Sequence, residues 1–184
     1  AAVSDAAARL NRHVVAALLA AGVGAVGLPP SASAVVEDGT IRQMAVAPVV
    51  GALDAGLLPV VFGDVAFDSV RGGTIVSTEE VLAFLAHALR PAWLLLAGET
   101  DGVLDAGGQV VARITRATLP DVLPALGGSR GTDVTGGMAS KVMAMLDLAA
   151  ARPGLGVRVF SGLQPGLLTE LLLDPTSPHG TELR

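Results

Sequence analysis

The chain has 184 residues, of which 51% are hydrophobic and 16% are charged, so it can bury a large core and extended disorder is excluded. Its net charge is −5 and it has no run of basic residues, which argues against a nucleic-acid partner. Cysteine is absent, which excludes disulfides and thiolate metal sites, and the three histidines lie too far apart to share a metal ion.

One uncharged stretch, residues 14–36, is long enough by count to cross a bilayer. Three glycines and the pair Pro29-Pro30 interrupt this stretch, so a helix followed by a buried strand explains it better than a spanning helix. The residues before it also lack the basic region of a signal peptide. We therefore expect a soluble, cytoplasmic protein without a membrane partner.

The first half of the chain predicts alternating helices and strands. Apolar residues at helical spacing predict a helix over residues 3–21, which a short buried strand at 23–28 follows. Turn residues at 37–39 predict a hairpin, and Pro48 predicts the start of a helix over 48–55. The apolar run 57–62 predicts a parallel strand that delivers a loop to a site.

The second half continues the alternation. Residues 77–80 have the spacing of a capping box and predict a helix that ends at Leu89. Further strands are predicted at 93–97 and 157–160, with a glycine turn at 107–108 and helices near Pro120, over 138–152 and over 165–173. Strands that alternate with helices predict an α/β fold with a parallel sheet covered on both faces.

The only lysine of the chain, Lys141, lies one helical turn after the pair Gly136 and Gly137. Glycines before a helix let the backbone approach a ligand, and the first free N–H groups of the helix point outward. A lysine one turn later can reach an anion held there. A solvated lysine behind a glycine-rich helix start explains the same spacing equally well, and the Walker pattern G-x-x-x-x-G-K is absent.

Four short segments combine glycine with aspartate, threonine or proline. They are P-V-V-F-G-D-V-A-F-D at 59–68, T-D-G-V at 100–103, D-V-T-G-G-M-A-S-K at 133–141 and G-L-Q-P-G at 162–166. In this order they resemble segments of the isopentenyl phosphate kinases, a family of the amino-acid kinase superfamily, and L-N-x-x-V-V at 10–15 resembles the family's helix. One match would be weak, but four ordered matches along nearly the whole chain are specific. The resemblance implies a three-layer αβα sandwich with a mostly parallel central sheet.

The same resemblance implies a kinase that uses ATP and Mg²⁺ to convert isopentenyl phosphate into isopentenyl diphosphate, a step of isoprenoid biosynthesis. Lys141 would contact the ATP phosphates above a loop formed by Gly136 and Gly137. The other residues that would line the nucleotide side are Glu99, Thr100, Asp101, Gly102, Asp133 and Thr135. On spacing alone, residues 100–102 read equally as a plain tight turn.

On the acceptor side, the resemblance implies that Gly63 and Asp64 lie beside the acceptor phosphate. It also implies that the first helix forms part of the pocket for the apolar tail of the acceptor. Glu79 would stand where related kinases use an acid that organises catalytic lysines. A loop aspartate that accepts hydrogen bonds from nearby backbone N–H groups is the alternative interpretation of Asp64.

Parts of the family pattern have no match here. The K-x-G-G-S loop and the histidine that meets the acceptor phosphate are not found, and Leu104 replaces a common tyrosine. We therefore expect one domain without its N-terminal strand-loop segment, in which residues 1–75 belong to the acceptor side and 76–184 bind the nucleotide. By itself it would bind ATP weakly and transfer no phosphate.

We expect a homodimer. The alternatives are a fosfomycin-kinase-like enzyme and a nucleotide-binding module without turnover.

Overall fold

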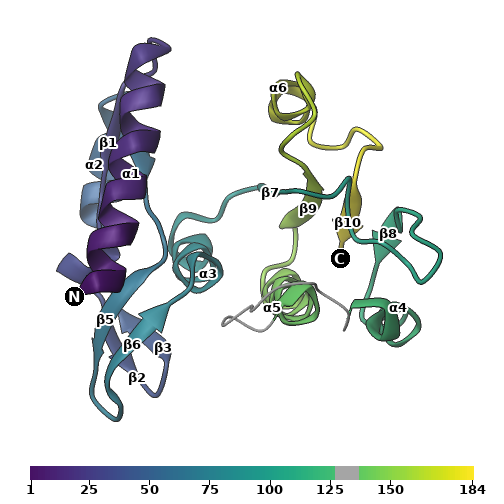
Figure 1. The fold of residues 1–184 in the computed structure, drawn as a ribbon, viewed down its shortest axis with the longest axis horizontal. Coiled ribbons are helices and arrows are strands. Elements are labelled where there is room, and N and C mark those ends of the chain that lie inside the picture. Colours follow the sequence, from purple (N-terminus) through teal and green to yellow (C-terminus); the bar gives the residue numbers. More distant parts are fainter. Residues whose placement is uncertain (127–136) are drawn as a thin grey trace. The chain divides into compact units, whose positions relative to one another are not determined.

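The computed structural model describes residues 1–126 and 137–184, which form two compact units, Ala1–Leu89 and Arg90–Arg184 (Figure 1). Each unit alternates helices with strands, as expected of the α/β class. The interpretation of the whole chain as one domain, divided near residue 75, stays a prediction. Among the helices of the described residues, none combines the length and the apolar character that a bilayer crossing requires.

Helix α1 (Ala2–Ala20) packs against a two-stranded parallel sheet in the first unit. Strand β1 (Ala25–Gly27) pairs with β4 (Leu58–Val60), and helix α2 (Ala47–Asp54) precedes β4. Gly22 follows α1 with a φ of 82°, a left-handed conformation that glycine adopts without strain and that ends the helix. The predicted helices are confirmed here, and the predicted strands are present but shorter than expected.

The second sheet of this unit has the strand order β3-β2-β5-β6. Strands β2 (Val35–Glu37) and β3 (Thr40–Gln43) form the predicted hairpin, and β5 (Asp64–Asp68) pairs parallel to β2 and antiparallel to β6 (Gly72–Val76). The β5-β6 hairpin differs from the expectation of a loop after residue 62. Two of the buried positions of β5 are aspartates, so its sequence lacks the alternation of apolar and polar residues by which a strand is usually predicted.

Asp68 explains how two aspartate-containing turns stay together. Its buried carboxylate accepts hydrogen bonds from the backbone N–H groups of Asp38 (3.1 Å), Gly39 (2.7 Å), Val70 (2.8 Å) and Arg71 (2.9 Å). Burial alone would raise its pKa, but these four bonds outweigh that effect and lower the pKa of Asp68 to about 2. One ionised side chain thus ties the β2-β3 turn to the β5-β6 turn.

Helix α3 (Thr78–Leu89) begins at the predicted cap, where the Ser77 Oγ accepts a hydrogen bond from the N–H of Glu80 at 3.1 Å. The helix buries one apolar face against the second sheet. The buried members of this core include Val36, Ile41, Val76, Val81 and Leu85.

The second unit contains a four-stranded mixed sheet in the order β7-β9-β10-β8. Strands β7 (Trp93–Gly98) and β9 (Gly156–Ser161) are parallel and in register along their whole length. Strand β10 (Thr181–Leu183) runs antiparallel to β9 and parallel to β8 (Arg113–Ile114). Strands β8 and β10 are not predicted by the pattern, because two or three residues show no recognisable period.

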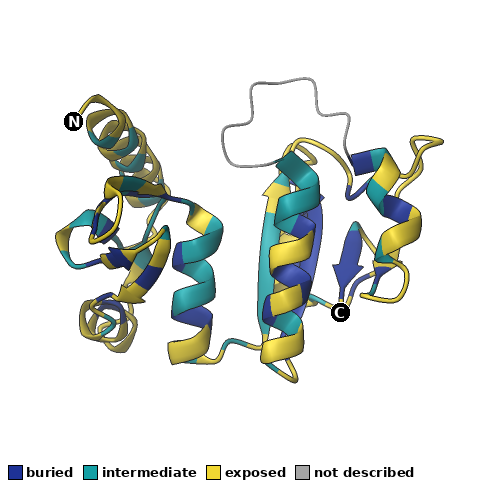
Figure 2. Cartoon of the chain, turned by 90° about the horizontal axis from the view of Figure 1, so that it is seen from below, coloured by how far each residue is buried: buried dark blue, intermediate teal, exposed yellow. Residues whose placement is uncertain are grey.

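The helices of this unit are α4 (Leu119–Leu126), α5 (Gly137–Ala151) and α6 (Leu167–Leu173). Strand β9 is buried at every position (Figure 2), including Arg158 in the middle of its otherwise mainly apolar sequence. Helix α5 contacts β9 and β10 and buries residues at the i, i+3, i+4 spacing of an amphipathic helix. Those residues are Val142, Met145 and Leu146.

Candidate functional site

The first candidate segment is the turn that leaves the carboxyl end of β7. Glu99, Thr100 and Asp101 are exposed, whereas Gly102 is buried. The Thr100 hydroxyl donates a hydrogen bond to the carbonyl oxygen of Gly102 at 2.8 Å, which closes the turn locally. Of the predicted nucleotide-binding residues in this turn, Glu99, Thr100 and Asp101 are therefore accessible to a ligand, whereas Gly102 is packed inside the protein.

Gly102 packs closely against the beginning of β10. A Cβ atom on Gly102 would lie 2.7 Å from the Thr181 Oγ1 and 2.8 Å from a Val110 methyl group, so a larger residue does not fit. The N–H of Val103 donates a hydrogen bond to the Thr181 Oγ1 at 2.8 Å, and both residues are fully buried. This contact joins residues 78 positions apart and is not visible in sequence spacing.

The residues after this turn form a tight loop. Leu104 and Val110 pair as an isolated antiparallel bridge, and the Asp105 Oδ1 accepts hydrogen bonds from the N–H groups of Gly107 (2.8 Å) and Gln109 (2.9 Å). Gly108 has a φ of 75°. The predicted glycine turn is confirmed, and it folds the chain back beside the residue-100 turn.

The second candidate segment, residues 162–166, leaves the carboxyl end of β9. The N–H of Gly162 donates to the carbonyl oxygen of Gly98 at 2.8 Å, so the turns after β7 and β9 begin side by side. A cavity of about 320 Å³ lies between them, and its polar lining residues include Asp101, Gln164 and His179. The ends of adjacent parallel strands are the usual position of ligand sites in α/β sheets. Gln164 and His179 had no role in the sequence prediction.

Lys141 lies in the second turn of α5 and is half-buried. Gly137 begins the helix with a φ of 71°, which favours glycine. A short connection, in which the N–H of Leu155 donates to the carbonyl oxygen of Arg152, joins the end of α5 to the beginning of β9. Helix α5 therefore runs antiparallel to β9, and Lys141 lies toward the carboxyl end of that strand. The predicted nucleotide residues Asp133, Thr135 and Gly136 lie outside the described residues.

In the first unit, Gly63 lies against the beginning of α3. Its N–H donates a hydrogen bond to the Thr78 Oγ1 at 3.0 Å, and a Cβ atom would lie 3.0 Å from the backbone nitrogen of Thr78. Glu79, the next residue of α3, is half-buried. The structure therefore brings the predicted acceptor-side residues Gly63 and Asp64 close to the beginning of α3, where the predicted catalytic acid Glu79 lies.

Asp64 is the first residue of β5 and its side chain is only 2% exposed. Its carboxylate accepts hydrogen bonds from the Ser4 hydroxyl (3.1 Å), the Ser31 N–H (3.4 Å) and its neighbour's N–H, that of Val65 (2.8 Å). These contacts tie the beginning of α1 and the short 3₁₀ helix η1 (Pro30–Ala32) to β5. The local bonding agrees with the alternative interpretation of Asp64, and its predicted role at the acceptor phosphate stays a prediction.

Two hollows flank α1 in this unit. One, of about 850 Å³, is lined by Ser4, Ser31 and residues of β5 and β6, and therefore lies next to the partners of Asp64. The other, of about 410 Å³, lies between α1 and the residues Gly27, Pro29 and Phe62. Both have mainly apolar walls, which suits the predicted apolar acceptor tail.

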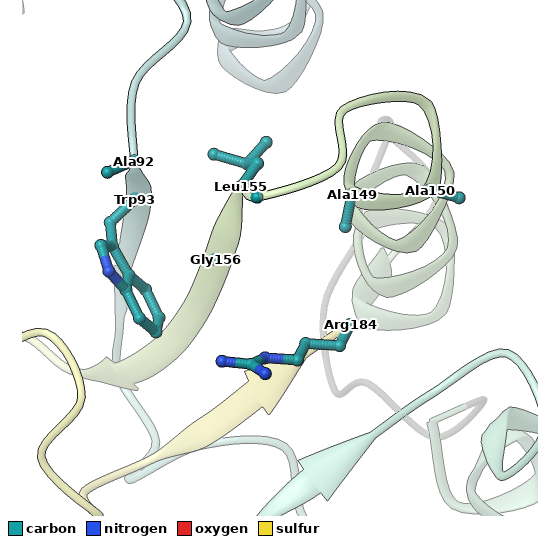
Figure 3. A pocket seen from close by; sticks show the side chains of 8 residues that line it. Ala92, Trp93, Ala149, Ala150, Leu155, Gly156 and Arg184 are labelled. Carbon is teal, nitrogen blue, oxygen red and sulfur yellow. The ribbon is translucent and has the colours of Figure 1, made fainter.

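A further cavity of about 410 Å³ lies at the amino-terminal ends of β7 and β9 (Figure 3). The Trp93 ring and the Arg184 side chain lie on either side of it, and alanine and glycine residues form most of the remaining wall. Among the described residues of the four segments that resemble the kinase family, none lines this cavity. The candidate nucleotide site therefore belongs to the opposite edge of the sheet.

Comparison with known proteins agrees with this arrangement. The amino acid kinase family matches residues 1–161. The chain belongs to the amino acid kinase family. It is 40% identical over 166 residues to the isopentenyl phosphate kinase of Haloferax volcanii, a match that covers 90% of this chain and 66% of that protein. It is 33% identical over 173 residues to the isopentenyl phosphate kinase of Methanothermobacter thermautotrophicus, covering 90% and 63%. The chain thus spans slightly less than two thirds of the length of these curated relatives.

Solved structures confirm the predicted amino-acid-kinase fold. An isopentenyl phosphate kinase structure superposes with a TM-score of 0.78 at 27% identity, covering 96% of this chain and 66% of the other. N-acetylglutamate synthase from Neisseria gonorrhoeae has a TM-score of 0.59 at 18% identity over 88% of this chain and 38% of its own, which shows likeness of fold alone. The resemblance to isopentenyl phosphate kinases is confirmed.

Proposed function

We propose that this chain carries the nucleotide site and part of the acceptor site of an ATP-dependent kinase that converts isopentenyl phosphate into isopentenyl diphosphate. The observation that carries the proposal is the cavity after β7 and β9, where two of the family-like segments meet. The identity of 40% to a protein named isopentenyl phosphate kinase supports the choice of acceptor.

The nucleotide would bind at the carboxyl ends of β7 and β9. The exposed residues Thr100 and Asp101 would border the adenosine, and Lys141 would approach the phosphates from α5 as a compact positive charge. Asp133, Thr135 and Gly136 would complete the phosphate loop with Gly137, as the resemblance implies. In this arrangement the backbone N–H groups at the start of α5 add donors for the phosphate oxygens.

Magnesium would enter together with ATP. Mg²⁺ prefers oxygen ligands and is commonly held by substrate phosphates and one or two carboxylates, and Glu99 and Asp101 offer exposed carboxylates at this turn. When bound, the ion neutralises phosphate charge during transfer.

The reaction would need no covalent intermediate with the protein. An oxygen of the acceptor phosphate attacks the γ-phosphorus of ATP, the bond from that phosphorus to the bridging oxygen breaks, and ADP leaves. The protein therefore acts by holding the two anions in line and by compensating their charge. Gly63 would let the acceptor phosphate approach the backbone near α3, and Asp64 would hold the surrounding Ser4 and Ser31 in place.

The cellular setting and assembly are part of the same proposal. The absence of cysteine suits the reducing cytoplasm. A homodimer is supported by α1, which has no buried residue and exposes apolar side chains. Those side chains are Val3, Leu10, Val14 and Leu19.

The test is an assay of the complete enzyme that contains this chain, with Mg-ATP and either isopentenyl phosphate or fosfomycin, and with products identified by ³¹P NMR. We expect a diphosphate product from isopentenyl phosphate and none from fosfomycin at equal concentration. Phosphorylation of fosfomycin alone would replace the proposal with the resistance-enzyme alternative. ATP binding without transfer to either acceptor would replace it with the binding module.

A further inference from the structure

We propose that Thr181 is a positioning residue for the nucleotide, because its buried hydroxyl holds the turn of residues 99–103 in its binding conformation. The inference rests on the proposed function, since it assigns a consequence for ATP binding to Thr181, a residue outside the family-like segments. Thr181 itself is fully buried and does not reach the ligand.

The contact is specific to a hydroxyl group. The Thr181 Oγ1 accepts the hydrogen bond of the Val103 N–H at 2.8 Å in a fully buried position. A buried backbone N–H that loses its acceptor cannot turn to water, so the turn must shift to find another partner. Gly102 packs against the same Thr181 Oγ1, and its carbonyl oxygen accepts the hydrogen bond of the Thr100 hydroxyl. A shift of the turn would therefore also displace Thr100 and Asp101.

Thr181 is in turn held by its neighbours. Gly180 has a φ of 76°, and a Cβ atom added to it would clash with the carbonyl oxygen of Val159, so that no side chain can be accommodated there. The buried guanidinium of Arg158 donates hydrogen bonds to the carbonyl oxygens of Pro175 (2.9 Å) and His179 (2.7 Å). The loop before Gly180 is therefore anchored to the middle of β9, and Thr181 has a fixed place from which to hold the turn.

The arrangement also connects the two sides of the cavity. The anchored loop contributes Pro178, His179 and Gly180 to the lining of the cavity, and the turn of residues 99–103 contributes Asp101. Because Thr181 follows this loop directly and binds the turn, it sets the separation of the two walls. Loss of the hydroxyl should therefore weaken nucleotide binding more than it affects the acceptor.

The experiment compares Thr181→Val, which keeps the shape and removes the acceptor, with Thr181→Ser, which keeps the hydroxyl. In the complete enzyme, Mg-ATP affinity is measured by calorimetry, and kcat and both KM values by the transfer assay. We expect Thr181→Val to weaken ATP binding about 10-fold, or about 1.4 kcal/mol, with the acceptor KM within about 2-fold of wild type. Thr181→Ser should stay close to wild type. The matched control is Thr115→Val, because the Thr115 hydroxyl lies in an exposed turn of the same unit.

Amide exchange of Val103, followed by NMR, provides a second measurement that does not depend on the folding of the valine variant. Slow exchange in wild type and in Thr181→Ser supports the inference, and fast exchange in wild type overturns it. Wild-type ATP affinity in Thr181→Val, or equal losses in the valine and serine variants, would also overturn it. A wild-type protein that binds no Mg-ATP would overturn the proposed function, and with it this inference. The two failures are therefore distinguishable.

Discussion

Burial separates the carboxylates that support the fold from those that can meet a ligand. Asp64 and Asp68 are buried and already accept several hydrogen bonds, which leaves little capacity for another partner. Glu99 and Asp101 are exposed beside the cavity after β7. At this scale, we expect substitutions of the first pair to act through local structure and those of the second pair through the nucleotide and its cation.

Lys141 provides the prediction that belongs to a single residue. Because Lys141 is the only lysine of the chain and lies near the beginning of α5, Lys141→Ala in the complete enzyme should lower kcat/KM by about 10- to 1,000-fold, at about 1.4 kcal/mol per decade. Lys141→Arg, which keeps the charge, should lose less. Arg152→Ala, which removes a cation at the opposite end of the helix, is the control and should change kcat/KM less than 2-fold. Unchanged kinetics in Lys141→Ala would remove the residue from the nucleotide site.

At the scale of elements, periodicity explains which parts of the fold could be predicted. Helix α5 and strand β9 were predicted to within one residue at each end, because apolar residues predominate in both and glycines flank them. Strand β10 was not predicted, because a glutamate in a sequence is expected to face solvent. In the structure Glu182 is buried and forms ion pairs with Arg113 and Arg184. The site shows the same limit. Motif spacing indicated the turn at 100–103, but its contact with Thr181 exists only after β10 joins the sheet.

The two hairpin turns joined by Asp68 predict a pH-dependent stability. The folded-state pKa of Asp68 is about 2, below its unfolded value near 3.9, so its contribution is present above about pH 4 and is lost as pH falls through about 2. Asp68→Asn should therefore lower Tm by several degrees at pH 7, and the difference from wild type should shrink as the pH falls toward 2. Asp54→Asn, at the exposed end of α2, is the control. A Tm difference that is independent of pH in thermal melts would contradict this role.

For the molecule as a whole, the central claim is that the nucleotide binds at one edge of the β7-β9-β10-β8 sheet. That edge carries the turns at 99–103 and 162–166, whereas the cavity beside Trp93 lies at the other edge (Figure 3). The first unit contains the predicted acceptor-side residues Gly63 and Asp64 and the predicted catalytic acid Glu79. Each unit therefore has a separate predicted task, and ligands should affect them separately.

Hydrogen exchange followed by mass spectrometry, with and without Mg-ATP, tests this claim most directly. We predict that Mg-ATP slows exchange in peptides that cover residues 99–112, 162–167 and the first turns of α5, and leaves the peptide around Trp93 unchanged. Isopentenyl phosphate alone should instead slow exchange around Gly63 and the beginning of α3. ATP-dependent protection confined to the Trp93 end of the sheet, or to the first unit, would contradict the account.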